Sequence, residues 1–103
     1  MILRRKHTNE YRGEAIGFSL IYSGNFRIQA EVDTHNVTRV TVGINPEGFD
    51  WKLEAGEMFQ TPEAVMVYSE NGLNGMSQTF HKLYGRRLAR GYWRDRCRPI
   101  LIY

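Results

Sequence analysis

The amino-acid sequence predicts a mainly β protein with one helix. In this α+β arrangement, part of an antiparallel β-sandwich is followed by a C-terminal amphipathic helix and one terminal strand. Apolar and polar residues alternate through much of residues 14–69, as they do in half-buried strands. At residues 70–72 the period changes to the i, i+3, i+4 spacing of a helix. A short apolar run, Ile100-Leu101-Ile102, then follows Pro99.

The bulk composition is that of one globular domain and argues against disorder. The sequence has 103 residues, of which 42% are hydrophobic and 24% charged. Residues 1–70 hold seven Lys or Arg against ten Asp or Glu, whereas residues 71–103 hold seven against Asp95 alone. The single Cys97 excludes an internal disulfide and fits a reducing compartment. No signal-peptide core and no run of ~20 apolar residues is present, so we expect a soluble, cytoplasmic chain with no membrane partner.

The first half of the sequence predicts three strands. Residues 1–12 are basic and without periodicity, and we expect them to be poorly ordered. Strands follow over residues 14–23, 26–33 and 37–45, joined by short turns as in an antiparallel meander. The middle strand alternates most cleanly, which predicts one buried face and one wet face. The apolar residues of that face are Phe26, Ile28, Ala30 and Val32.

The second half predicts two more strands, a helix and a final strand. Residues 49–54 alternate, and residues 57–69 form a long extended segment in which Pro62 marks an edge or a bend. The helix begins near Asn71 or Asn74, either of which could cap it, and ends at Gly91. Its apolar positions are Leu73, Met76, Phe80, Leu83, Tyr84 and Leu88.

The predicted organisation has four parts. A poorly ordered basic N-terminus covers residues 1–12, and a β-sandwich portion covers residues 13–70. A linker helix and Arg-rich connector cover residues 71–98. Residues 99–103 read as a strand buried on both faces, the kind found in parallel sheets, and we expect the remainder of such a sheet to be missing from this chain.

Several motifs occur in a specific order along nearly the whole sequence. They are Gly17-Phe-Ser-Leu-Ile-Tyr-Ser-Gly-Asn-Phe26, Gly43-Ile-Asn-Pro46, Trp51-Lys-Leu-Glu-Ala-Gly-Glu-Met-Phe-Gln-Thr-Pro-Glu63, Leu73-Asn-Gly-Met-Ser-Gln-Thr-Phe-His81, Arg90-Gly-Tyr-Trp-Arg-Asp95 and Arg98-Pro-Ile-Leu-Ile102. Together they resemble glycoside hydrolase family 36, the bacterial α-galactosidases. The resemblance covers the end of that family's N-terminal β-sandwich, the interdomain helix and the first strand of its (β/α)8 barrel, whereas residues 1–12 match poorly.

The resemblance implies an enzyme that hydrolyses terminal α-linked galactose from melibiose- or raffinose-type oligosaccharides. The family uses a retaining mechanism with two Asp side chains on barrel strands and needs no metal or cofactor. Those aspartates lie beyond the position that matches Tyr103, so the resemblance predicts a fragment that is catalytically inactive alone. Galactosides are the expected partners of the parent enzyme.

The residues themselves indicate no catalytic or metal site, and they leave the substrate-binding residues unknown. Retaining glycosidases need two carboxyl groups ~5–5.5 Å apart, one of them with a raised pKa. The eleven acids lie mostly on polar faces or in turns, where we expect solvated charges, and Asp95 is expected to pair with a neighbouring Arg. The histidines are widely separated, and no metal-ligand spacing occurs. Trp51 and Trp93 could stack on a sugar ring, but a core or interface role is favoured.

Two other function classes remain open. A stand-alone β-sandwich module could bind carbohydrate or a protein partner without catalysis. The arginines around Tyr92 and Trp93 could bind nucleic acid, but the acidic first two-thirds of the chain would repel phosphates, so we expect no nucleic-acid partner. The apolar helix face and residues 100–102 predict self-association through exposed apolar surface.

Overall fold

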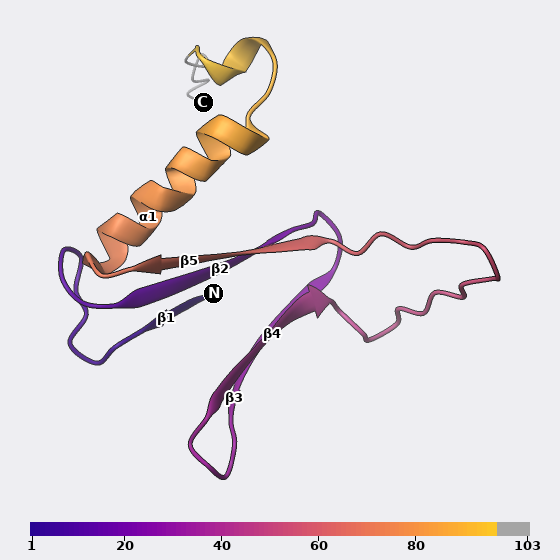
Figure 1. The fold of residues 1–103 in the computed structure, drawn as a ribbon, viewed down its shortest axis with the longest axis horizontal. Helices are drawn as coiled ribbons and strands as arrows, with labels where there is room; N and C mark the ends of the chain where they lie inside the picture. Colours follow the sequence, from indigo (N-terminus) through magenta and orange to yellow (C-terminus); the bar gives the residue numbers. More distant parts are fainter. Residues whose placement is uncertain (97–103) are drawn as a thin grey trace, which may run out of the picture. The chain divides into compact units, whose positions relative to one another are not determined.

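The computed structural model describes residues 1–96. Its elements are β1 (Ile2–Arg4), β2 (Ala15–Ile21), β3 (Phe26–Val32), β4 (Thr38–Ile44), β5 (Glu63–Ser69) and α1 (Gly72–Leu83), followed by a π-helical turn over Tyr84–Leu88 and a 3-10 turn over Tyr92–Arg94 (Figure 1). The prediction of a mainly β chain with one helix is therefore confirmed. The predicted strand at residues 99–103 lies outside the described residues.

The strands form two separate sheets. One has the order β1-β2-β5, and the other contains only β3 and β4. In the first, Met1 exchanges two backbone hydrogen bonds with Phe18, and the Arg5 N–H donates to the Glu14 carbonyl oxygen, so β1 runs antiparallel to β2. In the second, the register pairs Phe26 with Ile44 and Val32 with Thr38. The predicted meander is wrong in this respect, because β2 pairs with β1 and β5 and not with β3.

The β3–β4 hairpin is closed by an Asp33 side chain. Its Oδ1 accepts from the backbone N–H groups of His35, at 2.8 Å, and Val37, at 2.9 Å, which fixes the turn. The expected burial of the β3 apolar face is wrong, since Ile28 alone is half-buried and the other residues of the strand are exposed. Alternation predicts a strand correctly, but burial also needs a second layer of residues over that face.

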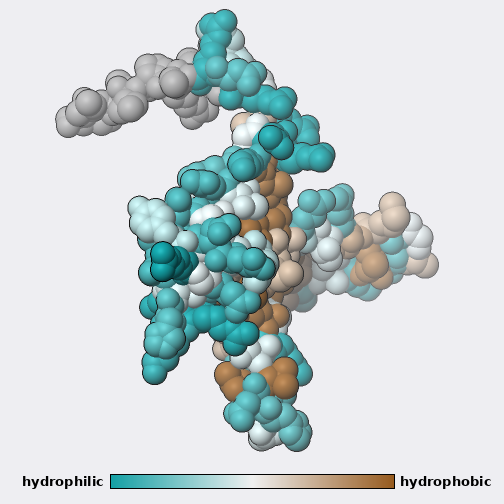
Figure 2. Space-filling view, turned by 60° about the vertical axis from the view of Figure 1, so that its left-hand side comes forward, coloured by the Kyte–Doolittle hydropathy of each residue, from teal (hydrophilic) through white to brown (hydrophobic). Residues whose placement is uncertain are grey.

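The chain divides into two compact units. One contains residues 1–3 and 17–66, and the other contains residues 4–16 and the chain from Val67 onwards. The buried apolar side chains among the described residues are Ala15, Val67 and Met76, all in the second unit, and none of the larger side chains is fully buried. Apolar side chains accordingly reach the surface (Figure 2).

The N-terminal segment differs from the expected poorly ordered tail. Residues 2–4 form β1, and a turn follows in which Asn9 Oδ1 accepts from the N–H groups of Tyr11 and Arg12. The buried Thr8 hydroxyl donates to the Glu14 carbonyl oxygen at 2.8 Å. These are turn and side-chain hydrogen bonds between residues close in sequence, and hydrophobic periodicity does not reveal bonds of this kind.

Two predicted extended segments are wrong in whole or in part. Residues 49–54 form no strand, and β5 begins at Glu63, so residues 57–62 are not part of it. Pro62 lacks the N–H that a ladder needs, and it directly precedes β5. Phe49 and Trp51, two of the alternating side chains, make ring contacts with Phe59 instead of facing a partner strand.

Helix α1 begins after Asn71 and is capped by backbone rather than by a side chain. The N–H groups of Gly72, Leu73 and Asn74 donate to the carbonyl oxygens of Gly13, Asn9 and Glu10 at 2.9, 3.1 and 2.9 Å. Asn71 makes no side-chain cap hydrogen bond, and the alternative cap, Asn74, lies inside the helix. The helix proper ends at Leu83, earlier than predicted, because the backbone continues as a π-helical turn.

Candidate functional site

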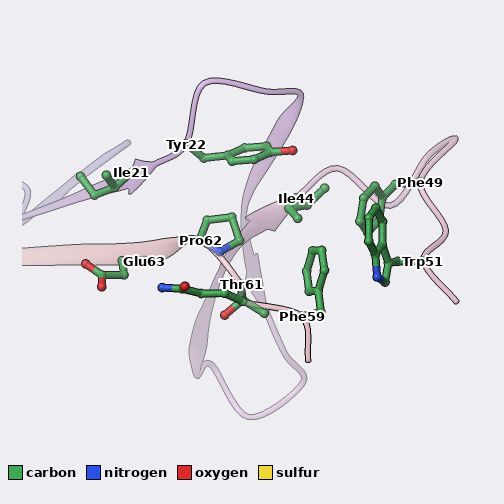
Figure 3. Close-up of a pocket in the computed structure, with 10 residues that line it drawn as sticks. Ile21, Tyr22, Ile44, Phe49, Trp51, Phe59, Thr61, Pro62 and Glu63 are labelled. Carbon is green, nitrogen blue, oxygen red and sulfur yellow. The ribbon is translucent and has the colours of Figure 1, made fainter. Parts of the chain in front are cut away.

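The first unit contains an apolar hollow of about 520 Å³. Its lining comes from the end of β2, the end of β4, the segment between β4 and β5, and the start of β5. The lining residues are Ile21, Tyr22, Ile44, Phe49, Trp51, Phe59, Gln60, Thr61, Pro62 and Glu63. In Figure 3, the Phe59 ring lies near the rings of Phe49 and Trp51, which overlap in this view.

Three aromatic rings form one end of the hollow. The Phe59 ring centroid lies 6.3 Å from that of Phe49 and 5.1 Å from that of Trp51, and both pairs are tilted. These are favourable geometries for aromatic pairs. Trp51 nevertheless remains 62% exposed, so its ring presents a large apolar area to solvent.

The segment that carries these rings is held by local turns. The Phe49 N–H donates to the Pro46 carbonyl oxygen at 3.4 Å, and the Glu57 N–H donates to the Glu54 carbonyl oxygen at 3.1 Å. The Glu54 N–H also donates to Glu57 Oε2 at 3.3 Å. Sequence reasoning identified Trp51 as a candidate for stacking but missed Phe59, because residues 57–62 were interpreted as strand.

The hollow can hold an apolar group but not perform glycoside hydrolysis. Among the described residues that line it, Glu63 supplies the one carboxylate, with Gln60 and Thr61 as further polar groups. Retaining hydrolysis needs a pair of carboxyl groups about 5–5.5 Å apart. The hollow is therefore a candidate contact or binding surface.

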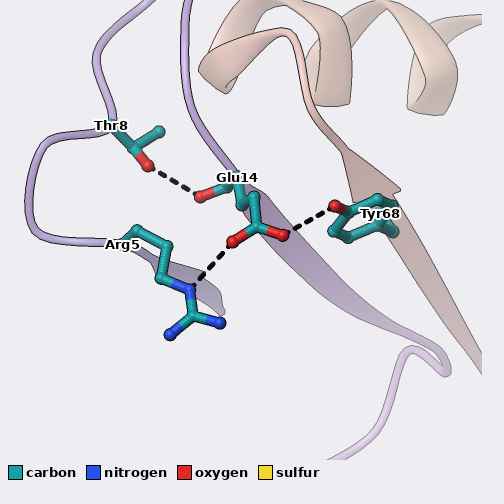
Figure 4. A network of polar contacts seen from close by, with 4 residues as sticks. All are labelled: Arg5, Thr8, Glu14 and Tyr68. Carbon is teal, nitrogen blue, oxygen red and sulfur yellow. Dashed lines mark hydrogen bonds and ion pairs between the residues drawn. The ribbon is translucent and has the colours of Figure 1, made fainter.

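The second unit contains a polar network centred on Glu14 (Figure 4). Its carboxylate accepts from the Tyr68 hydroxyl at 2.8 Å and from Arg5 Nε at 2.9 Å. The Tyr68 hydrogen bond, and then the hydrogen bond and charge of Arg5, lower the pKa of Glu14. The same hydrogen bond raises the pKa of Tyr68. A general acid needs a raised carboxyl pKa, so this network is suited to joining segments and not to proton donation.

All eleven acids lie at exposed positions, as expected for solvated charges. Arg39 pairs with Glu31 at 3.3 Å, and Lys52 pairs with Glu54 at 2.6 Å. The expected pairing of Asp95 with Arg94 or Arg96 is absent within residues 1–96, where Arg96 instead lies 4.3 Å from the Tyr92 ring centroid and donates to the Tyr92 hydroxyl.

No metal-binding cluster and no spanning helix occur in the part of the chain that the structure describes. His7, His35 and His81 are all exposed, and no three His, Cys, Asp or Glu side chains gather there in a way that could hold a metal ion. No helix within residues 1–96 combines the length and the apolar character needed to cross a membrane.

Comparison with known proteins gives a consistent result along the chain. The glycosyl hydrolase family 36 N-terminal domain matches residues 1–54, and the melibiase family matches residues 58–103. The chain belongs to glycosyl hydrolase family 36. The match to residues 1–54 includes the first dozen residues, so the expectation that they depart from the family is wrong.

Individual family 36 proteins are similar over nearly all of this chain. The α-galactosidase AgaA of Geobacillus stearothermophilus is 63% identical over 94% of this chain, and Mel36A of Lactobacillus acidophilus is 49% identical over 99%. The crystal structure of the family 36 α-galactosidase AgaB from G. stearothermophilus superposes with a TM-score of 0.92 at 61% identity and covers 96% of this chain. The chain spans 13–14% of the length of these relatives. The stand-alone binding module is not favoured.

Proposed function

We propose that this chain acts as part of an α-galactosidase, which hydrolyses terminal α-linked galactose from oligosaccharides. The 63% identity to AgaA across 94% of the chain supports this proposal most directly. AgaA variants have been crystallised with raffinose and with stachyose, both of which fit the proposed class of substrates.

In this proposal the chain has a structural role and no catalytic residue. The acids of the described range are exposed, the hollow carries a single carboxylate, and the Glu14 pKa moves away from that of a general acid. The resemblance to the family implies that a pair of aspartates elsewhere in such an enzyme performs retaining hydrolysis. This chain would contribute the end of the N-terminal domain and the beginning of the melibiase domain, which are the regions that its two family matches cover.

A chimera tests the activity. The segment of AgaA that matches this chain is replaced by residues 1–103, and release of galactose from raffinose is measured beside native AgaA and the isolated chain. We expect turnover within about an order of magnitude of native AgaA for the chimera and none for the isolated chain. A folded chimera without turnover would count against the proposal, and turnover by the isolated chain would refute the non-catalytic role.

Galactosides are the proposed partners of the whole enzyme, and a cytoplasmic location belongs to the same proposal. The chain's one cysteine, Cys97, supports that location because cytosolic proteins rarely depend on disulfides. We propose no nucleic-acid partner, since the acidic residues 1–70 oppose binding to a phosphate backbone.

A further inference from the structure

The segment between β4 and β5 is long, carries several exposed apolar side chains and has no regular structure. We name residues 45–62 the aromatic arm; they form neither helix nor strand (Figure 1). A structureless connection of this length is uncommon in a compact domain and usually has a function. Five large apolar side chains of the arm are exposed: Phe49, Trp51, Leu53, Met58 and Phe59.

The arm is ordered by its own contacts. Phe59 contacts both Phe49 and Trp51 through its ring, and two turns are closed by backbone hydrogen bonds. A surface that is already shaped loses less conformational entropy when it binds. The arm therefore has the properties of a preorganised contact surface.

The exposed apolar residues extend beyond the hollow, which argues for a protein occupant. Met58 is 96% exposed and Leu53 is 53% exposed, and neither lines the hollow. A single sugar would meet few polar partners in the hollow, where Gln60, Thr61 and Glu63 supply most of the polar groups. A protein surface can cover the thioether, the leucine and the rings together.

The charge of the arm argues against a second copy of the same arm as the occupant. The arm carries four acids, Glu47, Asp50, Glu54 and Glu57, against one cation, Lys52, so its formal net charge is −3. Lys52 is also already paired with Glu54. A symmetric pair of arms would place like charges opposite each other. The complementary surface has an apolar centre and a basic rim.

We propose that the aromatic arm docks on such a surface formed by the remainder of a family 36 enzyme, with Trp51 and Met58 as its anchors. The inference rests on the proposed function. This chain superposes on AgaB with a TM-score of 0.92, and the matched region is 14% of the AgaB chain. Most of the AgaB polypeptide therefore lies outside the match and can supply the surface. Large buried aromatic anchors dominate contacts of this kind.

The test measures the reactivity of a cysteine at position 58. Met58→Cys is made in a Cys97→Ser background, both in the isolated chain and in the AgaA chimera. Mass spectrometry of the peptide that contains position 58 measures the rate of maleimide labelling, in buffer and in urea. We expect labelling in buffer to be about tenfold or more slower in the chimera than in the isolated chain, and equal in urea.

Variants then identify the anchor. Trp51→Ala in the chimera should restore fast labelling, whereas Trp51→Phe and Tyr11→Ala should leave it slow, because Tyr11 is exposed but lies outside the arm. Equal labelling of the chimera and the isolated chain overturns the proposal. If labelling of the isolated chain slows as its concentration rises, the occupant of the arm is a second copy of the chain. If raffinose slows the labelling, the occupant is a sugar. Either result also overturns the proposal. Galactose release by the same chimera reports separately on the proposed function.

Discussion

Gly72 lies where the start of α1 meets the N-terminal turn. Its φ is +68°, and an added Cβ would lie 2.4 Å from the Asn9 carbonyl oxygen and 2.6 Å from that of Glu10. Those carbonyls accept the helix N–H groups, so they have little freedom to move. We therefore expect Gly72→Ala to lower the free energy of unfolding by about 2 kcal/mol or more, measured by urea denaturation.

Gly48→Ala is the matched control for this substitution. Its φ of +73° is similar, but nothing lies within 4 Å of its added Cβ. Gly48→Ala should therefore lower the free energy of unfolding by the backbone strain alone, which is about 1 kcal/mol. Equal losses for the two variants would mean that the contact with Asn9 and Glu10 contributes nothing.

The Glu14–Tyr68 hydrogen bond predicts a dependence of stability on pH. The folded-state pKa of Glu14 lies below the ordinary value of 4.5, so its contribution is fully present above that pH and is lost as the pH falls through the lower folded-state value. Tyr68→Phe removes the largest cause of the shift. We expect the Glu14 pKa to rise toward 4.5 in an NMR titration and the acid-side loss of stability to become shallower.

The Tyr68→Phe result has a control and a contrary outcome. Tyr11→Phe should leave the Glu14 titration unchanged, because the hydrogen bonds that shift the Glu14 pKa come from Tyr68 and Arg5. An unchanged Glu14 pKa in Tyr68→Phe would show that Arg5 alone holds the carboxylate in its charged form.

At the scale of elements, two glycines of the helical segment predict opposite effects. A Cβ at Gly75 would lie 2.6 Å from Ser69 Oγ and 2.9 Å from the Asn71 Cβ, whereas a Cβ at Gly85 meets nothing within 4 Å. Gly75→Ala should destabilise by about 1–2 kcal/mol through overpacking. Gly85→Ala should stabilise by about 0.5–1 kcal/mol, because alanine favours helix. Thermal unfolding followed by circular dichroism measures both, and a gain for Gly75→Ala would contradict the close packing there.

Local pattern predicted the elements whose causes are local. The alternation of residues 26–32 and the spacing of Leu73, Met76 and Phe80 predicted β3, its turn and α1 close to where they lie. What local pattern missed depends on long-range pairing: β1 beside β2, the separation of β2 from β3, and the backbone cap of α1 by residues 9–13.

The candidate site was predicted only in part for the same reason. The sequence indicates Trp51 as a candidate stacking residue because tryptophan is a large aromatic residue. Its partner Phe59 could be found only from the fold, since the two rings meet across a turn. The predicted strand at 49–54 failed because alternation reports an amphipathic segment and does not say whether a strand lies beside it. Apolar and polar residues alternate in part of the aromatic arm as they do in a strand, but the arm forms no strand and its rings contact one another.

At the scale of the whole molecule, the described residues include more exposed large apolar side chains than buried apolar ones. The buried apolar residues of the described range are three, while sixteen large apolar side chains are exposed. The helix face predicted to lack a partner is in fact partly covered, since Met76 is buried and Leu73, Phe80 and Leu83 are half-buried. The exposed large apolar residues lie mainly on the strands and the aromatic arm.

We expect the β3–β4 sheet to be the main site through which the isolated chain associates with further copies. Its two strands pair only with each other, so each has an outer edge with no strand beside it in the described residues. Val32, at the end of β3, is 65% exposed. Two-stranded ribbons are marginally stable alone, and open edges invite pairing with another chain. We therefore expect the isolated chain to associate through these strand edges, and we expect the aromatic arm to take no part in that association.

We therefore expect the isolated chain to scatter light as species larger than 12.0 kDa, increasingly so with concentration. Val32→Lys should reduce the association, because a charge on an edge strand opposes pairing with a second strand. Tyr11→Lys, which adds the same charge at an exposed position outside any strand, should not. A monodisperse monomer at high concentration would contradict the prediction. Equal effects of the two lysines would assign the association to net charge instead of to the open edge.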